Sequence, residues 1–100
     1  MSFMIRSFAA RATEDIFNGK NSRAARRTLP QKLVRVALRK LEQLDSVERL
    51  EDLRIPPGNR LEALKKKRTG QHSIRINEQY RVCFEWSDSG PEAVEIVDYH

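Results

Sequence analysis

The hydrophobic pattern of this chain changes its period once, between residues 44 and 72. Before the change, apolar residues recur at spacings of three and four, which is typical of a helix with one buried face. After it, apolar and polar residues alternate, which is typical of strands. The first set is Leu33, Val34, Ala37, Leu38, Leu41 and Leu44, and the alternation begins at His72. Because helices precede strands and do not interleave with them, the sequence predicts an α+β domain, with helices packed on one side of a small antiparallel sheet.

Turn-forming residues divide this pattern into elements. A first strand is expected at residues 3–8, a helix at 9–17 ended by Gly19, and a basic link at 20–27. Thr28 and Pro30 are expected to open the main helix, and a short helical stretch to lead to Leu53 and the turn at 56–58. Further strands are expected at 61–64, 72–76, 81–86 and 93–99, with a tight turn at 77–79 in which Asn77 tolerates positive φ.

One domain is expected to span residues 1–100, because 100 residues that are 39% hydrophobic are enough for one core. No apolar run approaches the length of a membrane span, and the first residues lack the features of a secretory signal. A single cysteine, Cys83, allows no internal disulfide. These features favour a cytoplasmic protein with no membrane partner.

Positive charge is concentrated in two parts of the chain. The net charge is +5, yet residues 20–40 carry eight cations and no carboxylate, and residues 54–70 are also strongly basic. Either block alone is as well explained by a solvated helix face. Together they favour a polyanionic partner, and nucleic acid more than an anionic membrane, because no apolar face with Trp or Phe accompanies the basic helix.

Several kinds of catalytic site require residues that this chain lacks. No Cys/His cluster for zinc, acidic set for two metals or phosphate-binding glycine loop is present, so no cofactor is expected. RNA carries its own nucleophile, the ribose 2′-hydroxyl, and its cleavage needs only a base, an acid and cations on the phosphate. We therefore expect metal-free chemistry if the substrate is RNA.

The last residues of the chain supply suitable groups. His100 has a side chain of near-neutral ordinary pKa, Tyr99 offers a hydroxyl and a ring, and Asp98 can orient an imidazole. Arg75 and Arg81 are expected on the sheet face opposite the apolar residues, giving a basic exposed face. A terminal Tyr-His pair is nevertheless more often surface than catalyst. His72, in phase with the apolar residues, is expected to be structural, and Phe84 and Trp86 to lie in the core.

Several segments together resemble one family. They are Leu53-Arg54, Pro56 to Lys65, Gly70-Gln71, Ser73 to Asn77, Gln79 to Phe84 and Val94 to His100, and the opening Met4 to Phe8 fits as well. In these segments the chain resembles the HigB toxins, also called plasmid-maintenance killer proteins, within the RelE-like superfamily.

The resemblance implies a RelE-like fold and cleavage of messenger RNA in the ribosomal A site, with the 2′-hydroxyl attacking the adjacent phosphate. It implies catalytic roles for the ending Asp98, Tyr99 and His100, and phosphate contacts for Arg81, Lys65 and Arg68. It also implies a helix-turn-helix antitoxin, HigA-like, whose complex with the toxin binds operator DNA. The full set of expected phosphate-binding residues is Arg60, Lys65, Lys66, Lys67, Arg68 and Arg75.

This chain departs from the family pattern at three places. Many relatives read Lys-Gly-Asp-Arg at residues 65–68, and carry Tyr or Trp at His72. A histidine that is catalytic in some members aligns with Glu62, so the general base is either His100 or Glu62. Two other functions stay open: a catalytically inactive co-repressor that binds the antitoxin, and a ribonuclease that needs no ribosome.

Overall fold

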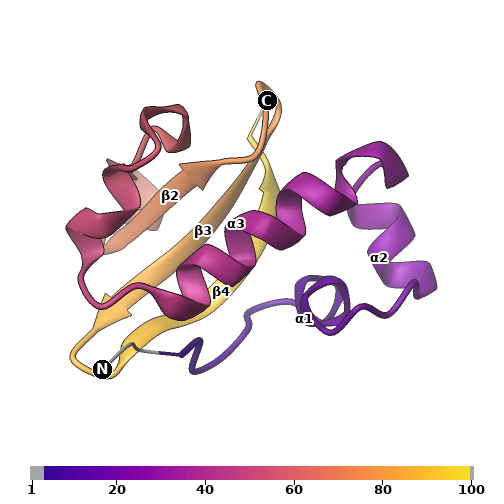
Figure 1. Ribbon diagram of the computed structural model, residues 1–100, viewed down its shortest axis with the longest axis horizontal. Coiled ribbons are helices and arrows are strands. Elements are labelled where there is room, and N and C mark those ends of the chain that lie inside the picture. Colours follow the sequence, from indigo (N-terminus) through magenta and orange to yellow (C-terminus); the bar gives the residue numbers. More distant parts are fainter. Residues whose placement is uncertain (1–3, 100) are drawn as a thin grey trace.

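The computed structural model describes residues 4–99 and consists of a meandering sheet beside three α-helices (Figure 1). The helices are α1 (Arg11–Phe17), α2 (Arg23–Thr28) and α3 (Val34–Ser46). The strands are β1 (Glu62–Ala63), β2 (Gln71–Arg75), β3 (Tyr80–Ser87) and β4 (Gly90–Asp98). Short 3-10 helices are η1 (Gln31–Leu33), η2 (Leu50–Arg54), η3 (Pro57–Asn59) and η4 (Lys66–Arg68).

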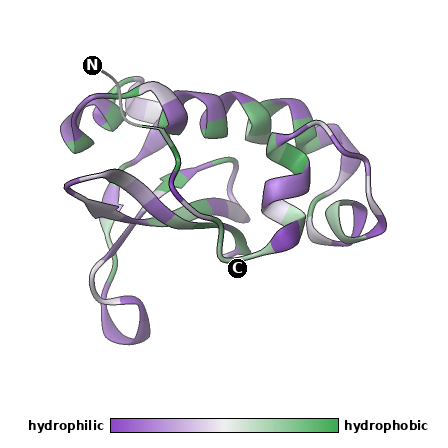
Figure 2. Ribbon diagram, turned by 90° about the horizontal axis from the view of Figure 1, so that it is seen from below, coloured by the Kyte–Doolittle hydropathy of each residue, from purple (hydrophilic) through white to green (hydrophobic). Residues whose placement is uncertain are grey.

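The four strands form one antiparallel sheet in the order β1-β2-β3-β4. Helix α3 crosses one face of this sheet, and Figure 2 shows the helices as a layer on that side. The expected α+β class, with helices packed on one side of a small antiparallel sheet, is therefore confirmed.

The core lies between α3 and the sheet. Ala37, Leu41 and Leu44 of the predicted apolar stripe are fully buried. They belong to one hydrophobic cluster with Ile74, Val82, Phe84 and Val94 from the strands. Trp86 was also expected in the core, but it is only half-buried and packs against the edge of this cluster. The apolar face of α3 thus packs against the apolar face of the sheet. Burial of one face in each element explains why both periodicities are so clear in the sequence.

The predicted first strand at residues 3–8 is wrong for the described part, residues 4–8. Phe8 makes only an isolated parallel bridge with Val94. The neighbouring backbone still follows β4, since the Val94 amide donates to the Ser7 carbonyl at 3.1 Å and the Arg6 amide to the Pro91 carbonyl at 2.8 Å. The backbone of β4 is irregular at this point, because Ala93 has φ 51° and the β3–β4 register shifts between Cys83 and Glu85, which marks a bulge.

The basic link predicted at residues 20–27 is also wrong, because Arg23–Thr28 form helix α2. Ser22 caps this helix by accepting a hydrogen bond from the Ala25 amide at 3.1 Å, and it donates to buried Asp15 at 2.7 Å. Thr28 therefore ends a helix and does not open one. Helix α3 begins at Val34 after the 3-10 turn Gln31–Leu33.

The β2–β3 turn forms where it was predicted, but side-chain hydrogen bonds of Asn77 stabilise it, and not a positive φ at that residue. The Asn77 side chain accepts hydrogen bonds from the amides of Gln79 at 2.9 Å and Tyr80 at 2.8 Å. Asn77 is not among the residues with positive φ. Its role is that of an Asx turn, in which the side chain replaces a backbone acceptor.

A buried asparagine holds the segment that leads into β1. The Asn59 side chain is fully buried and donates to the Leu53 carbonyl and to the Gln43 side chain, each at 3.0 Å, while it accepts from Lys40. This network ties residues 53–60 to α3, and it fixes the start of the strand that carries Glu62.

Candidate active site on the charged sheet face

The sheet face turned away from α3 is covered by charged side chains. We call this surface, made by Glu62, Arg68, Arg75, Arg81 and Glu95, the charged sheet face. Beneath it Ser73 and Cys83 are buried, with exposures of 0% and 1%. Burial raises the pKa of the Cys83 thiol, so it stays a neutral structural group.

Arg81 has the most buried side chain among the three arginines of this face, only 14% exposed. Its Nη1 donates to Ser73 Oγ at 2.8 Å and to the Arg60 carbonyl at 3.3 Å, and it pairs with Glu62 Oε1 at 2.9 Å. All three contacts use Nη1. Within residues 4–99, Nη2 and Nε have no such hydrogen bond, so this edge of the guanidinium remains for a phosphate.

Tyr99 completes the surroundings of Arg81. The Arg81 guanidinium carbon lies 5.4 Å from the centre of the Tyr99 ring, and Tyr99 is 44% exposed. Gln79 positions this end of β4, because its carbonyl accepts from the Tyr99 amide at 2.6 Å and its side chain donates to Asp98 at 3.1 Å. An exposed ring beside a held guanidinium is suited to stack on a nucleic acid base.

The Lys65–Arg68 block forms η4 and the residues around it. Lys65, Lys66 and Lys67 are exposed, whereas Arg68 is half-buried and bonds Gln71 Oε1 at 2.9 Å and Glu95 at 3.7 Å. Lys66 has φ 58°, a conformation that favours glycine. Lys66 therefore adds positive charge at the cost of backbone strain.

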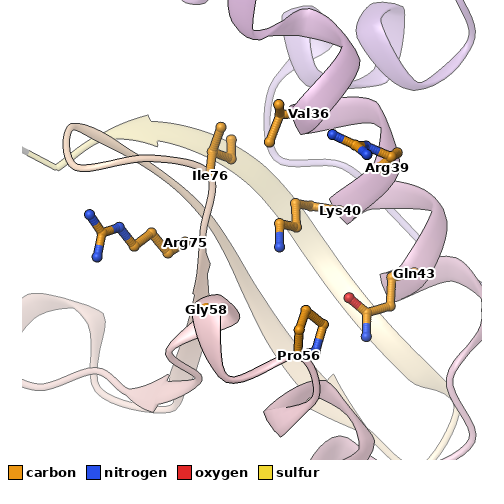
Figure 3. A pocket seen from close by; sticks show the side chains of 8 residues that line it. All are labelled: Val36, Arg39, Lys40, Gln43, Pro56, Gly58, Arg75 and Ile76. Carbon is orange, nitrogen blue, oxygen red and sulfur yellow. The ribbon is translucent and has the colours of Figure 1, made fainter.

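Arg75 lies next to Arg81 in the sheet register and pairs loosely with exposed Glu78 at 3.9 Å. Arg75 also borders a cavity of about 400 Å³ between α3 and the end of β2, which Lys40 lines from the helix side. The Arg75 guanidinium points away from this cavity and from Lys40 (Figure 3). Burial, and then the charge of Arg39, lowers the pKa of Lys40. The cavity and the charged sheet face are therefore separate surfaces.

His72 lies on the opposite face, as expected for a structural residue. Its ring stacks on Phe84 with centroids 6.1 Å apart, and its Nδ1 is buried without a hydrogen-bond partner among residues 4–99. Burial lowers the pKa of His72, which favours the neutral ring at neutral pH.

The structure gathers some of the predicted site residues and separates others. Arg81 contacts both Glu62 and Tyr99, and Asp98 precedes Tyr99 in the chain. Arg60 contributes its carbonyl to Arg81 and has φ 46°. His100 lies outside the described residues. The expectation of a simply basic face needs correction, because Arg68, Arg75 and Arg81 each pair with a carboxylate.

Two residues of this site were not singled out from the sequence. Ser73 holds Arg81, and Gln79 holds the end of β4. The register could have suggested Ser73, because it is a small polar residue in phase with Arg75. Gln79 gives no such signal, since its contacts depend on the turn geometry.

Comparison with known proteins gives the site its context. Residues 6–100 match the family model described as the RelE-like toxin of the type II toxin-antitoxin system HigB. The chain belongs to the HigB-like toxin family.

Two curated proteins show related sequences within this range. A protein named Toxin HigB-1 from Vibrio cholerae is 48% identical over 62 residues, which cover 62% of this HigB-like chain and 65% of the relative. An uncharacterized protein from Haemophilus influenzae is 39% identical over 61 residues, which cover 61% of the chain and 60% of the relative. The matches thus span less than two thirds of either relative.

None of the helices within residues 4–99 of this HigB-like toxin is long and apolar enough to span a membrane.

Proposed function

We propose that this HigB-like toxin is a ribosome-dependent endoribonuclease that cleaves messenger RNA with side chains alone. The observation that carries the proposal is the Arg81 cluster: a held guanidinium with a free edge, a carboxylate at 2.9 Å and an exposed tyrosine ring on one sheet face. A cation, a candidate base and a stacking ring are the groups that cleavage through the 2′-hydroxyl requires.

The proposed reaction breaks one phosphodiester bond. A base removes the proton of the 2′-hydroxyl, whose oxygen attacks the adjacent phosphorus in line. The bond to the 5′ oxygen breaks, an acid protonates that oxygen, and a 2′,3′-cyclic phosphate remains on the upstream fragment. Arg81 stabilises the negative charge that builds on the phosphoryl oxygens, and Tyr99 stacks on a neighbouring base.

Two residues compete for the role of base. Glu62 has a carboxylate that is half exposed and in contact with Arg81, so it can reach a phosphate bound there. His100 follows Asp98 and Tyr99 directly in the chain, and imidazole is the side-chain group most often used as a general base. If Glu62 is the base, His100 is the natural proton donor to the leaving oxygen. If His100 is the base, the Tyr99 hydroxyl is the donor, because Glu62 is ionised in its pair with Arg81 and has no proton to give.

Lys65, Lys67 and Arg68 are proposed to hold the flanking phosphates. Their position at one end of the charged sheet face gives a longer cationic track that continues from Arg81. We further propose that the protein acts in the cytoplasm, and that its partner is a HigA-like helix-turn-helix antitoxin whose complex binds operator DNA.

The decisive experiment is to map the 5′ ends of cellular messages after induction of the wild type, His100→Ala and Glu62→Gln. The wild type should produce new 5′ ends within translated codons. The variant that lacks the base should produce few of these ends or none. Ends that also arise on naked RNA with purified protein would indicate a ribosome-independent ribonuclease. Normal growth without new ends would instead support the co-repressor function.

A further inference from the structure

A second concentration of cations lies away from the candidate active site. We call residues 20–40, which form α2, η1 and the first half of α3, the basic helical segment. Its eight cations meet no carboxylate within ion-pairing distance in residues 4–99. They are Lys20, Arg23, Arg26, Arg27, Lys32, Arg35, Arg39 and Lys40. The proposed reaction gives them no role.

An apolar cavity opens within this segment. It measures about 150 Å³ and lies where the end of α1 meets α2 and the start of α3. Ile16, Ala25, Val34 and Leu38 form its apolar walls. Lys20 and Arg26 are its charged lining residues, and both are exposed.

The local structure explains why this cavity stays open. Gly19, with φ 77°, turns the chain sharply after α1, and the Ser22–Asp15 hydrogen bond then holds the start of α2 against α1. Arg26 is also held, because its Nη1 donates to the Asn21 carbonyl at 2.5 Å. A charged group is therefore fixed beside an apolar recess.

The combination favours a protein partner over nucleic acid. A cavity of about 150 Å³ can hold a benzene-sized group, and so it suits one Leu or Phe side chain. A phosphate backbone would satisfy the cations but would leave the apolar walls uncovered. Because no carboxylate pairs with these eight cations, acidic residues around the inserted side chain would complement the surface in charge.

We propose that this surface is the docking site for an acidic amphipathic segment of the antitoxin. One apolar side chain of that segment fills the cavity between Ile16 and Leu38, and flanking carboxylates pair with Lys20 and Arg26. This inference rests on the toxin–antitoxin part of the proposed function, but it does not depend on the nuclease chemistry.

The test is the affinity of the purified toxin for its cognate antitoxin, measured by calorimetry. Lys20→Glu/Arg26→Glu should weaken binding by about tenfold or more, because two attractions become repulsions. Val34→Phe, which fills the cavity from its wall, should weaken binding by about tenfold, because the apolar side chain loses its place. Arg6→Glu/Arg11→Glu makes the same charge change at exposed positions outside the segment, and should bind as the wild type does.

A compensating change makes the test more specific. Replacing acidic residues of the antitoxin segment by lysine should restore binding to Lys20→Glu/Arg26→Glu and weaken binding to the wild type. The thermal unfolding midpoint of each variant checks that it is folded. If Val34→Phe does not fold, the affinities of Lys20→Glu/Arg26→Glu for the wild-type and the lysine-substituted antitoxin decide the test.

Wild-type affinity in the charge variant would overturn the proposal. So would a loss of ribosome co-sedimentation with unchanged antitoxin affinity, since the surface would then contact RNA. Because calorimetry involves no cleavage, weakened antitoxin binding in a protein that cuts no RNA would refute the proposed nuclease and leave this docking site standing.

Discussion

The basic helical segment and the charged sheet face are both rich in cations, but they hold them differently. In the helical segment no cation has a carboxylate partner within residues 4–99, whereas Arg68, Arg75 and Arg81 of the sheet face each have one. Exposed cations without a carboxylate partner provide a long-range field that salt screens. Partnered arginines on a rigid sheet provide fixed geometry, which catalysis needs.

The difference also determines how an anion binds. At the helical segment an acidic partner adds its carboxylates without displacing any. In the proposed active site, a phosphate would use the free edge of the Arg81 guanidinium and would compete with Glu62 for the same charge. Net charge along a sequence therefore shows where anions are attracted, but not where they are positioned.

The largest effect is expected from Arg81→Ala. Cleavage of ribosome-bound message should fall by about 10²–10³-fold, as when a donor to developing negative charge is removed. Arg81→Lys should recover little, because one ammonium cannot hold Ser73, Glu62 and a phosphate together. Arg11→Ala, an exposed cation of α1, is the control. Rapid cleavage by Arg81→Ala would remove the charged sheet face from the mechanism.

Glu62→Gln tests the competition at Arg81. The neutral amide should lower KM for ribosome-bound message by several-fold, about the value of one exposed ion pair. Single-turnover rates then assign the base: a fall in kcat of about 10²-fold identifies Glu62, and an unchanged kcat identifies His100. A KM that does not fall would show that the pair does not compete with phosphate.

Lys66→Gly tests the strain within η4. The substitution should raise the free energy of unfolding by about 1 kcal/mol, because φ 58° costs a side-chain-bearing residue that much. Lys67→Gly removes the same charge one residue away, where φ is not positive, and should not stabilise. Chemical denaturation measures both. Equal stabilities would mean that Lys66 is not strained.

The smallest effect concerns His72, on the sheet face beneath the helices. Burial lowers the pKa of His72 in the folded state below its ordinary value of 6.5. Its contribution to stability is therefore complete above pH 6.5 and is lost as the pH falls through the folded-state pKa. Denaturation at pH 7.5 and pH 5 should show a larger loss for the wild type than for His72→Phe. Equal losses would show that His72 is not desolvated.

The sequence predicted the fold where one hydrophobic period held over a whole element. The α3 stripe from Leu33 to Leu44 and the strands around Ile74 and Val82 are examples, because burial of a single face dictates the pattern. Prediction failed at α2, where the six residues Arg23–Thr28 are too few and too basic to show a period. It failed also at residues 4–8, because their course is set by contacts with β4, which lies at the far end of the chain.

The site was predictable to the level of which residues share a face. Alternation placed Arg75 and Arg81 opposite Ile74 and Val82, and the register confirms it. The ion pairs could not be predicted, since Glu62 approaches Arg81 only through the β1–β2 pairing of Glu62 with Ser73. Two residues of β1 thus decide the chemistry of the neighbouring strands.

The N-terminal segment that runs beside β4 has a consequence for how this protein associates with others. Between Pro91 and Val94, outward backbone groups of β4 are engaged: the Pro91 and Val94 carbonyls accept from the Arg6 and Ala9 amides, and the Val94 amide donates to the Ser7 carbonyl. A sheet whose outer strand is already occupied resists edge-to-edge addition, which is a common route to aggregation. Strand exchange along this part of the edge would first have to displace residues 6–9 from β4. This barrier disfavours aggregation of the protein when it is produced without its partner.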